Sequence, residues 1–100
     1  MFDYIKGELV DYDEDYLVVE TGGIGYTIEP SRGVVSDLPE EGDQVKIFLH
    51  LDVKEDDMSL YGFSGPRERE IFRMMLSVSR LGPKTALTVL SSMKKSEFRR

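Results

Sequence analysis

Cysteine is absent from the 100 residues, which excludes disulfide bonds and thiolate metal sites and fits a reducing compartment. No apolar run approaches the roughly 18 residues that a membrane span needs. The first residues, MFDYIKGELV, lack the basic and then apolar layout of a signal peptide. We therefore expect a cytoplasmic protein with no membrane segment.

The sequence also lacks the common motifs of catalysis and cofactor binding. No Walker-type phosphate loop is present, so no ATPase is expected in this chain. GGIGYTI (22–28) lacks the third glycine of a dinucleotide fingerprint and leads into a strand pattern. DYDED (11–15) begins like a calcium loop, but Tyr16 and Gly22 stand where that loop needs glycine and glutamate. The single histidine, His50, has no nucleophile placed beside it and is interpreted as structural. We predict a non-catalytic protein without cofactor or metal.

What the sequence does contain is a sharp change in charge along the chain. With 40% hydrophobic and 32% charged residues, it has the composition of one modest folded domain, or of a small barrel with a helical appendage. Residues 1–63 carry four Lys or Arg and sixteen Asp or Glu, a net charge of −12. Residues 64–100 carry nine and three, a net charge of +6. This difference predicts two segments with different surfaces and roles, although both charge sets could simply be solubilising.

Five short strands are predicted in the first segment because runs of β-branched and aromatic residues alternate with charged or breaker-rich loops. The runs are YIKGELV, YLVVE, IGYTIE, QVKIFLHLDV and SLYGF. Five short strands favour a small closed barrel, since closure removes exposed strand edges. Gly7, Gly25 and Gly62 fall inside strand patterns, where a bulge or a sharp bend is expected.

Helical periodicity begins at Ser64, a possible N-cap, with Pro66 near the first helical position. The apolar residues expected to face the core from this first helix are Ile71, Met74, Met75 and Val78. A second helix is predicted from about 83 or 84 to 92, burying Ala86, Leu87, Leu90 and Met93. A third begins near Ser96, and the abrupt end at Arg100 indicates a truncated chain.

The turn between the two predicted helices, LGPKTA (81–86), has the features of an anion site. The first amides of a helix have no intrahelical partners, and the helix dipole adds positive charge there. Gly82 removes the side chain that would hold a phosphate away, Pro83 fixes φ at the helix start, and Lys84 adds a mobile charge. An ordinary helical hairpin with a surface lysine is the alternative interpretation.

The stretch SVSRLGPKTALTVL (77–90) resembles a helix-hairpin-helix of the RuvA family of Holliday-junction-binding proteins. The resemblance extends along the chain through YIKGELV, GGIGYTIE, LPEEGDQVKIFLHLDVKEDDMSLYGF and EREIFRMMLSVSRLGPKTALTVLSSM, in order and at the family's spacing. It implies an oligonucleotide/oligosaccharide-binding (OB) barrel at 1–63, then a first helix-hairpin-helix segment at 64–100. The family's second hairpin and motor-binding domain are absent from this sequence.

The resemblance also implies a function, namely a homotetramer that holds a four-way DNA junction open for branch migration. Glu55 and Asp56 match the family's acidic pin at the junction crossover, and Asp57 extends it. Carboxylates repel phosphates, so such a pin parts the strands and excludes continuous duplex, while basic hairpins hold the arms. The residues expected to contact DNA phosphates are Arg80, Leu81, Gly82, Lys84 and Thr85. Arg80 departs from the family, which usually has glycine there.

The partners implied for the full-length protein are a RuvB-type hexameric ATPase and a RuvC-type resolvase, with roles in recombination, repair and the response to DNA damage. One alternative is a general single-strand or duplex DNA binder without junction specificity. It would need basic and aromatic residues interleaved on the strands, and the net charge of −12 on the predicted barrel argues against it. Another is a helix-hairpin-helix glycosylase fragment, which would need a helical domain before the hairpin, whereas strands precede it here.

Overall fold

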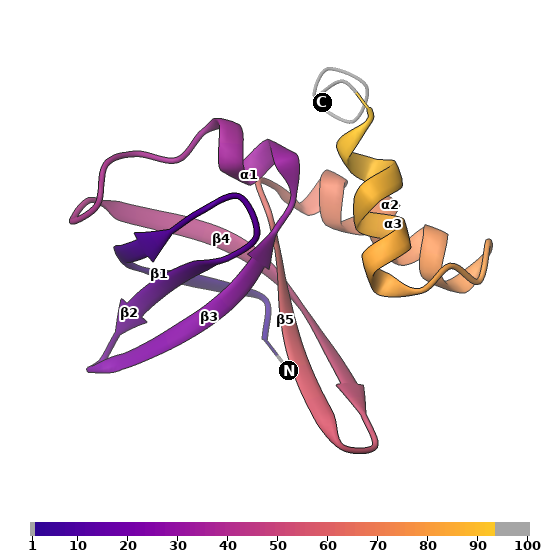
Figure 1. The fold of residues 1–100 in the computed structure, drawn as a ribbon, viewed down its shortest axis with the longest axis horizontal. Coiled ribbons are helices and arrows are strands. Elements are labelled where there is room, and N and C mark those ends of the chain that lie inside the picture. Colours follow the sequence, from indigo (N-terminus) through magenta and orange to yellow (C-terminus); the bar gives the residue numbers. More distant parts are fainter. Residues whose placement is uncertain (1, 94–100) are drawn as a thin grey trace.

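The computed structural model describes residues 2–93 and shows a five-stranded barrel with a projecting hairpin and a helical pair beside it (Figure 1). In chain order the elements are β1 (Tyr4–Tyr12), β2 (Leu17–Thr21), β3 (Ile24–Pro30), α1 (Arg32–Ser36), β4 (Gln44–Lys54), β5 (Asp57–Phe63), α2 (Pro66–Ser77) and α3 (Pro83–Ser91). The five predicted strands are confirmed, and the closed barrel is consistent with an OB-fold.

The barrel closes in the order β1-β2-β3-β5-β4, with β4 returning to β1. The β3–β5 pairing is parallel and short, placing Glu29 opposite Tyr61, and the other pairings are antiparallel. β1 pairs with β4 through its first half and with β2 through its second half, with a shift in register between Leu9 and Asp11. This bulge turns β1 between its two partners, and closure depends on it.

Two strand glycines serve close approach rather than bulging. A Cβ atom at Gly7 would collide with the carbonyl oxygen of Glu20. At Gly62 a Cβ atom would lie 2.6 Å from a methyl carbon of Ile28 and 2.7 Å from one of Ile47. The register shift of β1 lies beyond Leu9 rather than at a glycine, so the bulge alternative does not hold at Gly7, and the sharp bend stays a prediction; no side chain fits at Gly7 or Gly62.

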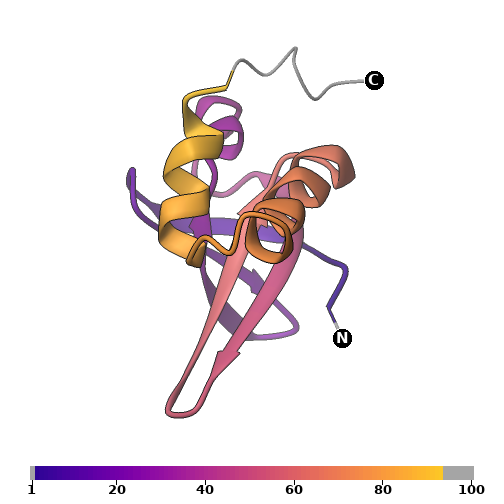
Figure 2. The ribbon, with the colours of Figure 1, turned by 90° about the vertical axis from the view of Figure 1, so that its right-hand side faces the viewer.

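Two groups of buried side chains hold the molecule together. The barrel interior consists of aliphatic residues: Ile5, Leu9, Leu17, Val19, Ile28, Val34, Val45, Ile47 and Leu49. The second group lies where α2 and α3 meet β5, and consists of Tyr61, Phe63, Phe72, Ala86 and Leu90. The helical pair thus packs on the outside of the barrel, against one strand end (Figure 2).

One helix was not predicted. The segment 31–43 has the composition of a loop, yet residues 32–36 form the single turn α1. The hydroxyl oxygen of Ser31 accepts a hydrogen bond from the amide of Val34 at 3.3 Å, and Val34 is buried in the barrel core. A serine cap and one buried valine are enough to form the turn because tertiary packing overrides the weak local signal.

The buried face of α2 agrees only in part with the prediction, because, of the four expected residues, Ile71 and Met75 pack against the second core. Met74 and Val78 are 53% and 76% exposed, whereas Phe72 is fully buried and Glu68 is only 2% exposed. The N-cap is Gly65 rather than Ser64, and Pro66 is at the start of the helix as expected. The helix is rotated about its axis relative to the predicted orientation, because its first turn buries the carboxylate of Glu68 and not an apolar residue. The spacing of the apolar residues alone does not show that a carboxylate is buried.

α3 begins at Pro83 and buries Ala86 and Leu90, as predicted, and ends at Ser91, with Leu87 and Met93 partly buried. The predicted third helix near Ser96 lies outside the described residues. Within residues 2–93, no helix has both the length and the apolar character needed to cross a bilayer.

Candidate nucleic-acid interface

The turn between α2 and α3 presents the start of a helix to solvent. Gly82 is the N-cap of α3 with φ −70° and ψ 160°, Pro83 occupies the first turn, and no side chain caps the helix. Gly82, Lys84 and Thr85 are exposed or half-buried, while Leu81 is half-buried and packs against the second core. The uncapped amides and the helix dipole therefore face outward, which suits an anion.

Arg80 has the conformation that a glycine would favour. Its φ is +56°, the one positive value at a non-glycine position among residues 2–93. The residue follows α2, and the Leu81 amide then returns to the carbonyl of Met75 at 3.3 Å. Left-handed residues of this kind commonly end helices and are usually glycine. A side chain with a Cβ atom there costs about 1 kcal/mol.

Lys84 is tied to the barrel by an ion pair that the sequence did not suggest. Its Nζ lies 2.5 Å from Oε1 of Glu29 on β3 and 5.9 Å from the ring centroid of Tyr61. The Lys84 side chain is 75% exposed, so the pair is open to solvent. The hydrogen bond to Glu29 raises the pKa of Lys84, and the carboxylate of Asp57 acts in the same direction. A phosphate that binds Lys84 must therefore compete with Glu29.

The β4–β5 hairpin extends beyond the barrel and bears the predicted pin residues at its end (Figures 1 and 2). Glu55 and Asp56 form the two-residue turn, and Asp57 begins β5 opposite Lys54. All three carboxylates are exposed. Within residues 2–93, neither Glu55 nor Asp56 has an ion-pair partner, so their charge is not neutralised locally.

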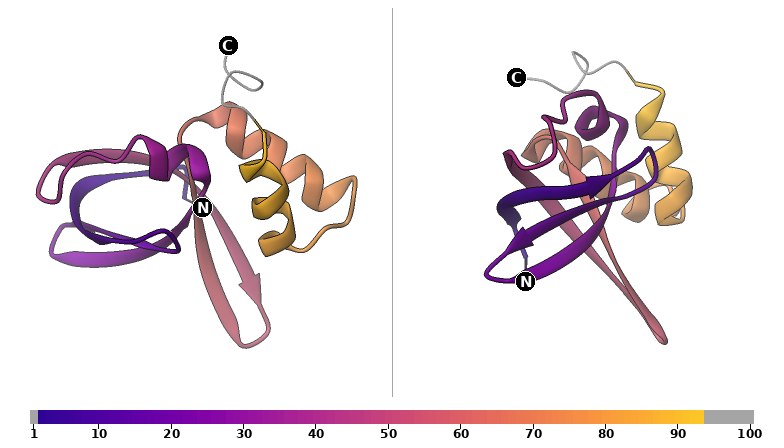
Figure 3. Two further views of the ribbon diagram at one scale, coloured as in Figure 1. Left: turned by 45° about the horizontal axis from the view of Figure 1, so that its top comes forward. Right: turned by 60° about the vertical axis from the view of Figure 1, so that its left-hand side comes forward.

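The hairpin and the helical pair lie on the same side of the barrel (Figure 3). The Lys84–Glu29 pair and the influence of Asp57 on the pKa of Lys84 link α3 to the adjoining strands β3 and β5. The cationic turn and the anionic hairpin are thus neighbours but separate projections. One large ligand that lies along this side can meet both.

The orientation of α2 depends on the buried carboxylate of Glu68. Its Oε1 accepts hydrogen bonds from the Ser31 hydroxyl at 2.9 Å, the Ser64 amide at 2.8 Å and the Ser64 hydroxyl at 3.0 Å. A Cβ atom at Gly33 would lie 2.7 Å from Oε2 of Glu68, so α1 passes directly over the group. A single carboxylate thus joins the end of β3, α1 and the start of α2.

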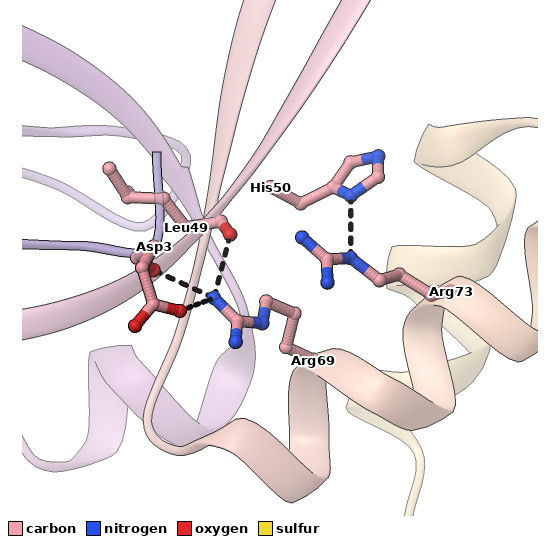
Figure 4. A network of polar contacts seen from close by, with 5 residues as sticks. All are labelled: Asp3, Leu49, His50, Arg69 and Arg73. Atoms are coloured by element: carbon pink, nitrogen blue, oxygen red, sulfur yellow. Dashed lines mark hydrogen bonds and ion pairs between the residues drawn. The ribbon is translucent and has the colours of Figure 1, made fainter. Parts of the chain in front are cut away.

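Two arginines fix the other side of α2 to the barrel (Figure 4). Nη1 of Arg69 donates to the carbonyl oxygens of Asp3 at 2.7 Å and Leu49 at 3.2 Å, and lies 2.9 Å from the Asp3 carboxylate. Nε of Arg73 donates to Nδ1 of His50 at 3.0 Å. Burial lowers the pKa of His50, and the charge of Arg73 lowers it further. Because Nδ1 accepts a hydrogen bond, His50 joins helix to strand in its neutral form.

The residues described show no site for a metal ion. No group of three or more His, Cys, Asp or Glu side chains in the described part of the chain is arranged to hold one. The acidic residues are instead spread over the strands, the barrel loops, α2 and the hairpin end.

Comparison with known proteins bears directly on these projections. A model of the family described as the RuvA N terminal domain matches residues 1–62. Proteins named Holliday junction branch migration complex subunit RuvA match more of the chain. Those of Prosthecochloris aestuarii and Marinomonas sp. are each 44% identical over 98 residues, which is 98% of this chain and 49% of each relative. That of Clostridium beijerinckii is 43% identical over 91 residues, 91% of this chain and 46% of the relative.

The chain belongs to the RuvA family. It spans about half the length of the curated relatives that it matches. The family model ends at residue 62, within β5, whereas the match to the relatives covers nearly the whole chain. The helical pair is therefore part of what this chain shares with RuvA proteins.

In this RuvA-family chain the structure brings together some of the predicted site residues and separates others. Leu81, Gly82, Lys84 and Thr85 share one turn, with Arg80 immediately before it. The pin residues Glu55, Asp56 and Asp57 share the hairpin end. Sequence reasoning assigned no site role to Glu29, Glu68 or Arg69, which position these elements. Glu68 had a detectable signal, since it is a carboxylate in the first turn of a helix that follows a serine.

Proposed function

We propose that this chain is the junction-binding part of a RuvA subunit, with the α2–α3 turn as a helix-hairpin-helix that grips DNA phosphates. The observation that carries the proposal is the pairing of a cationic helix start and an anionic hairpin end on one side of the barrel, in a RuvA-family chain. The proposed ligand, a Holliday junction, is taken from the name of the relatives, Holliday junction branch migration complex subunit RuvA.

The two projections would act with opposite signs. The backbone amides of Gly82, Lys84 and Thr85 and the ammonium of Lys84 attract phosphates of the arms, in a contact that reads no base sequence. Glu55 and Asp56 carry uncompensated charge and repel phosphates, so a continuous duplex is disfavoured where the hairpin end must sit. A four-way junction leaves an opening at its centre for that hairpin. Shape, rather than sequence, then decides what binds.

The carboxylate of Glu29 competes with DNA phosphates for Lys84. It pairs with Lys84 in the free protein, and a phosphate takes its place when DNA binds. The exchange costs little because Lys84 remains largely exposed and exposed ion pairs contribute at most about 1 kcal/mol. Weak non-junction encounters would leave the pair intact.

The full-length protein would work as a non-catalytic subunit. We propose a homotetramer around the junction, with a RuvB-type hexameric ATPase supplying branch migration and a RuvC-type resolvase acting on the same junction, in the cytoplasm. No catalytic or cofactor role is assigned to any residue of this chain.

The test compares binding of a four-way junction with binding of a duplex of equal arm length, by gel shift over a range of salt. We expect preference for the junction in the wild type. Lys84→Gln should weaken the binding of both DNAs alike. It should also reduce the slope of log affinity against log salt concentration by roughly 0.9, the contribution of one phosphate. Glu29→Gln should strengthen the binding of both DNAs, because it frees Lys84. Equal affinity of the wild-type chain for junction and duplex would overturn the proposal.

A further inference from the structure

The barrel has a mouth at the end where β1 extends past β2. Residues 4–7 of β1 pair with β4 alone, because pairing with β2 begins only at Glu8. A pocket of about 320 Å³ opens there, with the rings of Phe2, Tyr4 and Tyr26 and the side chain of Lys6 around it, and Ile5 among its apolar lining. Ligand pockets are found in barrel mouths, and this volume is at the small end of their usual range of about 300–1,000 Å³.

Two lysines face each other on adjoining strands; Lys6 lines the pocket, and Lys46 lies over the ring of Tyr4, which also lines it. Lys6 on β1 lies directly opposite Lys46 on β4 in the antiparallel register. Like charges directly opposite on adjacent strands are destabilising. Among residues 2–93 neither lysine forms an ion pair, although Glu8 is the next residue on the same face of β1. A segment with four cations and sixteen carboxylates thus places two of its cations together, unpaired. An anionic ligand would explain this placement.

Aromatic rings accompany the cations. Nζ of Lys46 lies 4.4 Å from the ring centroid of Tyr4 and 5.2 Å from that of Phe48. Phe2 and Tyr4 are each 48% exposed, so their rings are available to a ligand. Cations next to exposed rings are the surface that unpaired nucleic-acid strands use, since bases stack on the rings and phosphates lie by the cations. The net charge of −12 had argued against such a surface, but the fold brings two of the four cations of this segment together at one place.

We propose that the barrel mouth binds one unpaired nucleotide of a nucleic-acid strand, with the base in the pocket against Tyr4 and the adjacent phosphate at Lys6 and Lys46. This site is separate from the α2–α3 turn and the hairpin end, and it adds to junction recognition without replacing it. It requires a strand whose bases are free, because a duplex does not present an unstacked base to a pocket of this size.

The test is fluorescence anisotropy with a short fluorescein-labelled oligothymidylate, using this chain and its variants. Tyr4→Leu should weaken binding about tenfold, in line with the loss of one base–aromatic stack. Tyr12→Leu is the matched control, since Tyr12 is also exposed on β1 but lies at the other end of the strand. The double variant Lys6→Gln/Lys46→Gln should weaken binding and reduce the salt slope by about 0.7 for each phosphate that the lysines no longer neutralise. Arg67→Gln removes one exposed cation on α2 and controls for the loss of a positive charge away from the mouth.

Folding is checked separately in the charge test. The double variant relieves the repulsion between two opposed cations but also removes the contacts of Lys46 with the rings of Tyr4 and Phe48, so circular dichroism must show that it is folded at the assay temperature. The proposal is wrong if the double variant binds the oligonucleotide as tightly as Arg67→Gln does. It is also wrong if the variants change only the solution mass, because the patch would then join two copies of the chain. The effects of Glu55 variants on junction preference, and of Lys84 variants on overall DNA affinity, do not bear on this result, so the two proposals fail separately.

Discussion

In the barrel, nine buried aliphatic side chains pack inside a closed ring of strands. The helical pair packs outside that ring, and among residues 2–93 it contributes three fully buried apolar residues, Phe72, Ala86 and Leu90, with partly buried ones around them. The barrel pairs its strands on all sides, so its surface can carry a large negative charge without loss of shape. The helical pair depends instead on individual contacts at its base. Its cationic turn is therefore positioned by a few residues that each matter.

Phe72 should show the largest effect, because it is the central ring of the second core. It is fully buried, with ring centroids 4.8 Å from Phe63 and 5.6 Å from Tyr61. Phe72→Ala should lower the free energy of unfolding by about 3–5 kcal/mol. Met74→Ala, two residues along on the exposed face, should change it by less than about 0.5 kcal/mol. Urea unfolding compares them, and similar losses would mean that the face of α2 is wrongly assigned.

Glu68 should show the second-largest effect on stability. Its loss leaves three hydrogen-bond donors between the barrel and α2 without an acceptor. Glu68→Ala should destabilise the fold by about 3 kcal/mol, given about 1–3 kcal/mol for each buried group left unsatisfied. Glu70→Ala removes only an exposed pair with Arg67 and should cost less than about 0.5 kcal/mol. Thermal melting by circular dichroism measures both. Equal melting temperatures would show that the buried carboxylate does not join the two regions.

Arg80 offers a gain in stability. Arg80→Gly should stabilise the chain by about 1 kcal/mol, because glycine adopts the left-handed conformation without steric cost. Arg80→Ala keeps the Cβ atom while removing the charge, and should give no such gain. Unfolding in urea distinguishes a conformational effect from an electrostatic one. An equal gain in both variants would place the effect in the guanidinium rather than in the backbone.

His50 should give the smallest effect, visible as a pH dependence. Its pKa is lowered in the folded state, so the unfolded chain binds more protons below its ordinary pKa of about 6.5. The free energy of unfolding should therefore fall as the pH drops below about 6.5. Protonation of His50 should also break its hydrogen bond with Arg73, because Nδ1 can then no longer accept. Melting temperatures at neutral and mildly acidic pH, for the wild type and His50→Gln, measure this. The same acid sensitivity in both proteins would assign it to other groups.

The sequence predicted the barrel more completely than it predicted the helical pair. Runs such as YIKGELV identified the strands from their β-branched and aromatic residues, and the structure shows buried and exposed residues alternating along this one. In α2 the apolar positions Met74 and Val78 also fit a helical face, yet the helix turns toward Glu68 and Phe72. A buried carboxylate is stable only with its donors in place, and Ser31 lies far from it in sequence.

For the candidate site too, the sequence identified the local stretches but not the contacts between distant segments. The residues of the turn and the hairpin end are local stretches, and both could be named from the sequence. Glu29 could not, because it meets Lys84 only through the parallel pairing of β3 with β5. The lysine pair at the barrel mouth likewise depends on the β1–β4 register. Contacts between distant segments require the fold itself.

The central claim is that opposite charges on two neighbouring projections select the shape of DNA, and one affinity ratio tests it directly. The measurement is junction affinity divided by duplex affinity for Glu55→Gln/Asp56→Asn, with Glu40→Gln/Glu41→Gln as a control pair of exposed adjacent carboxylates in another loop. The account predicts that the pin variant gains duplex affinity and loses most of its junction preference, while the control keeps the wild-type ratio. An unchanged ratio in the pin variant would contradict it.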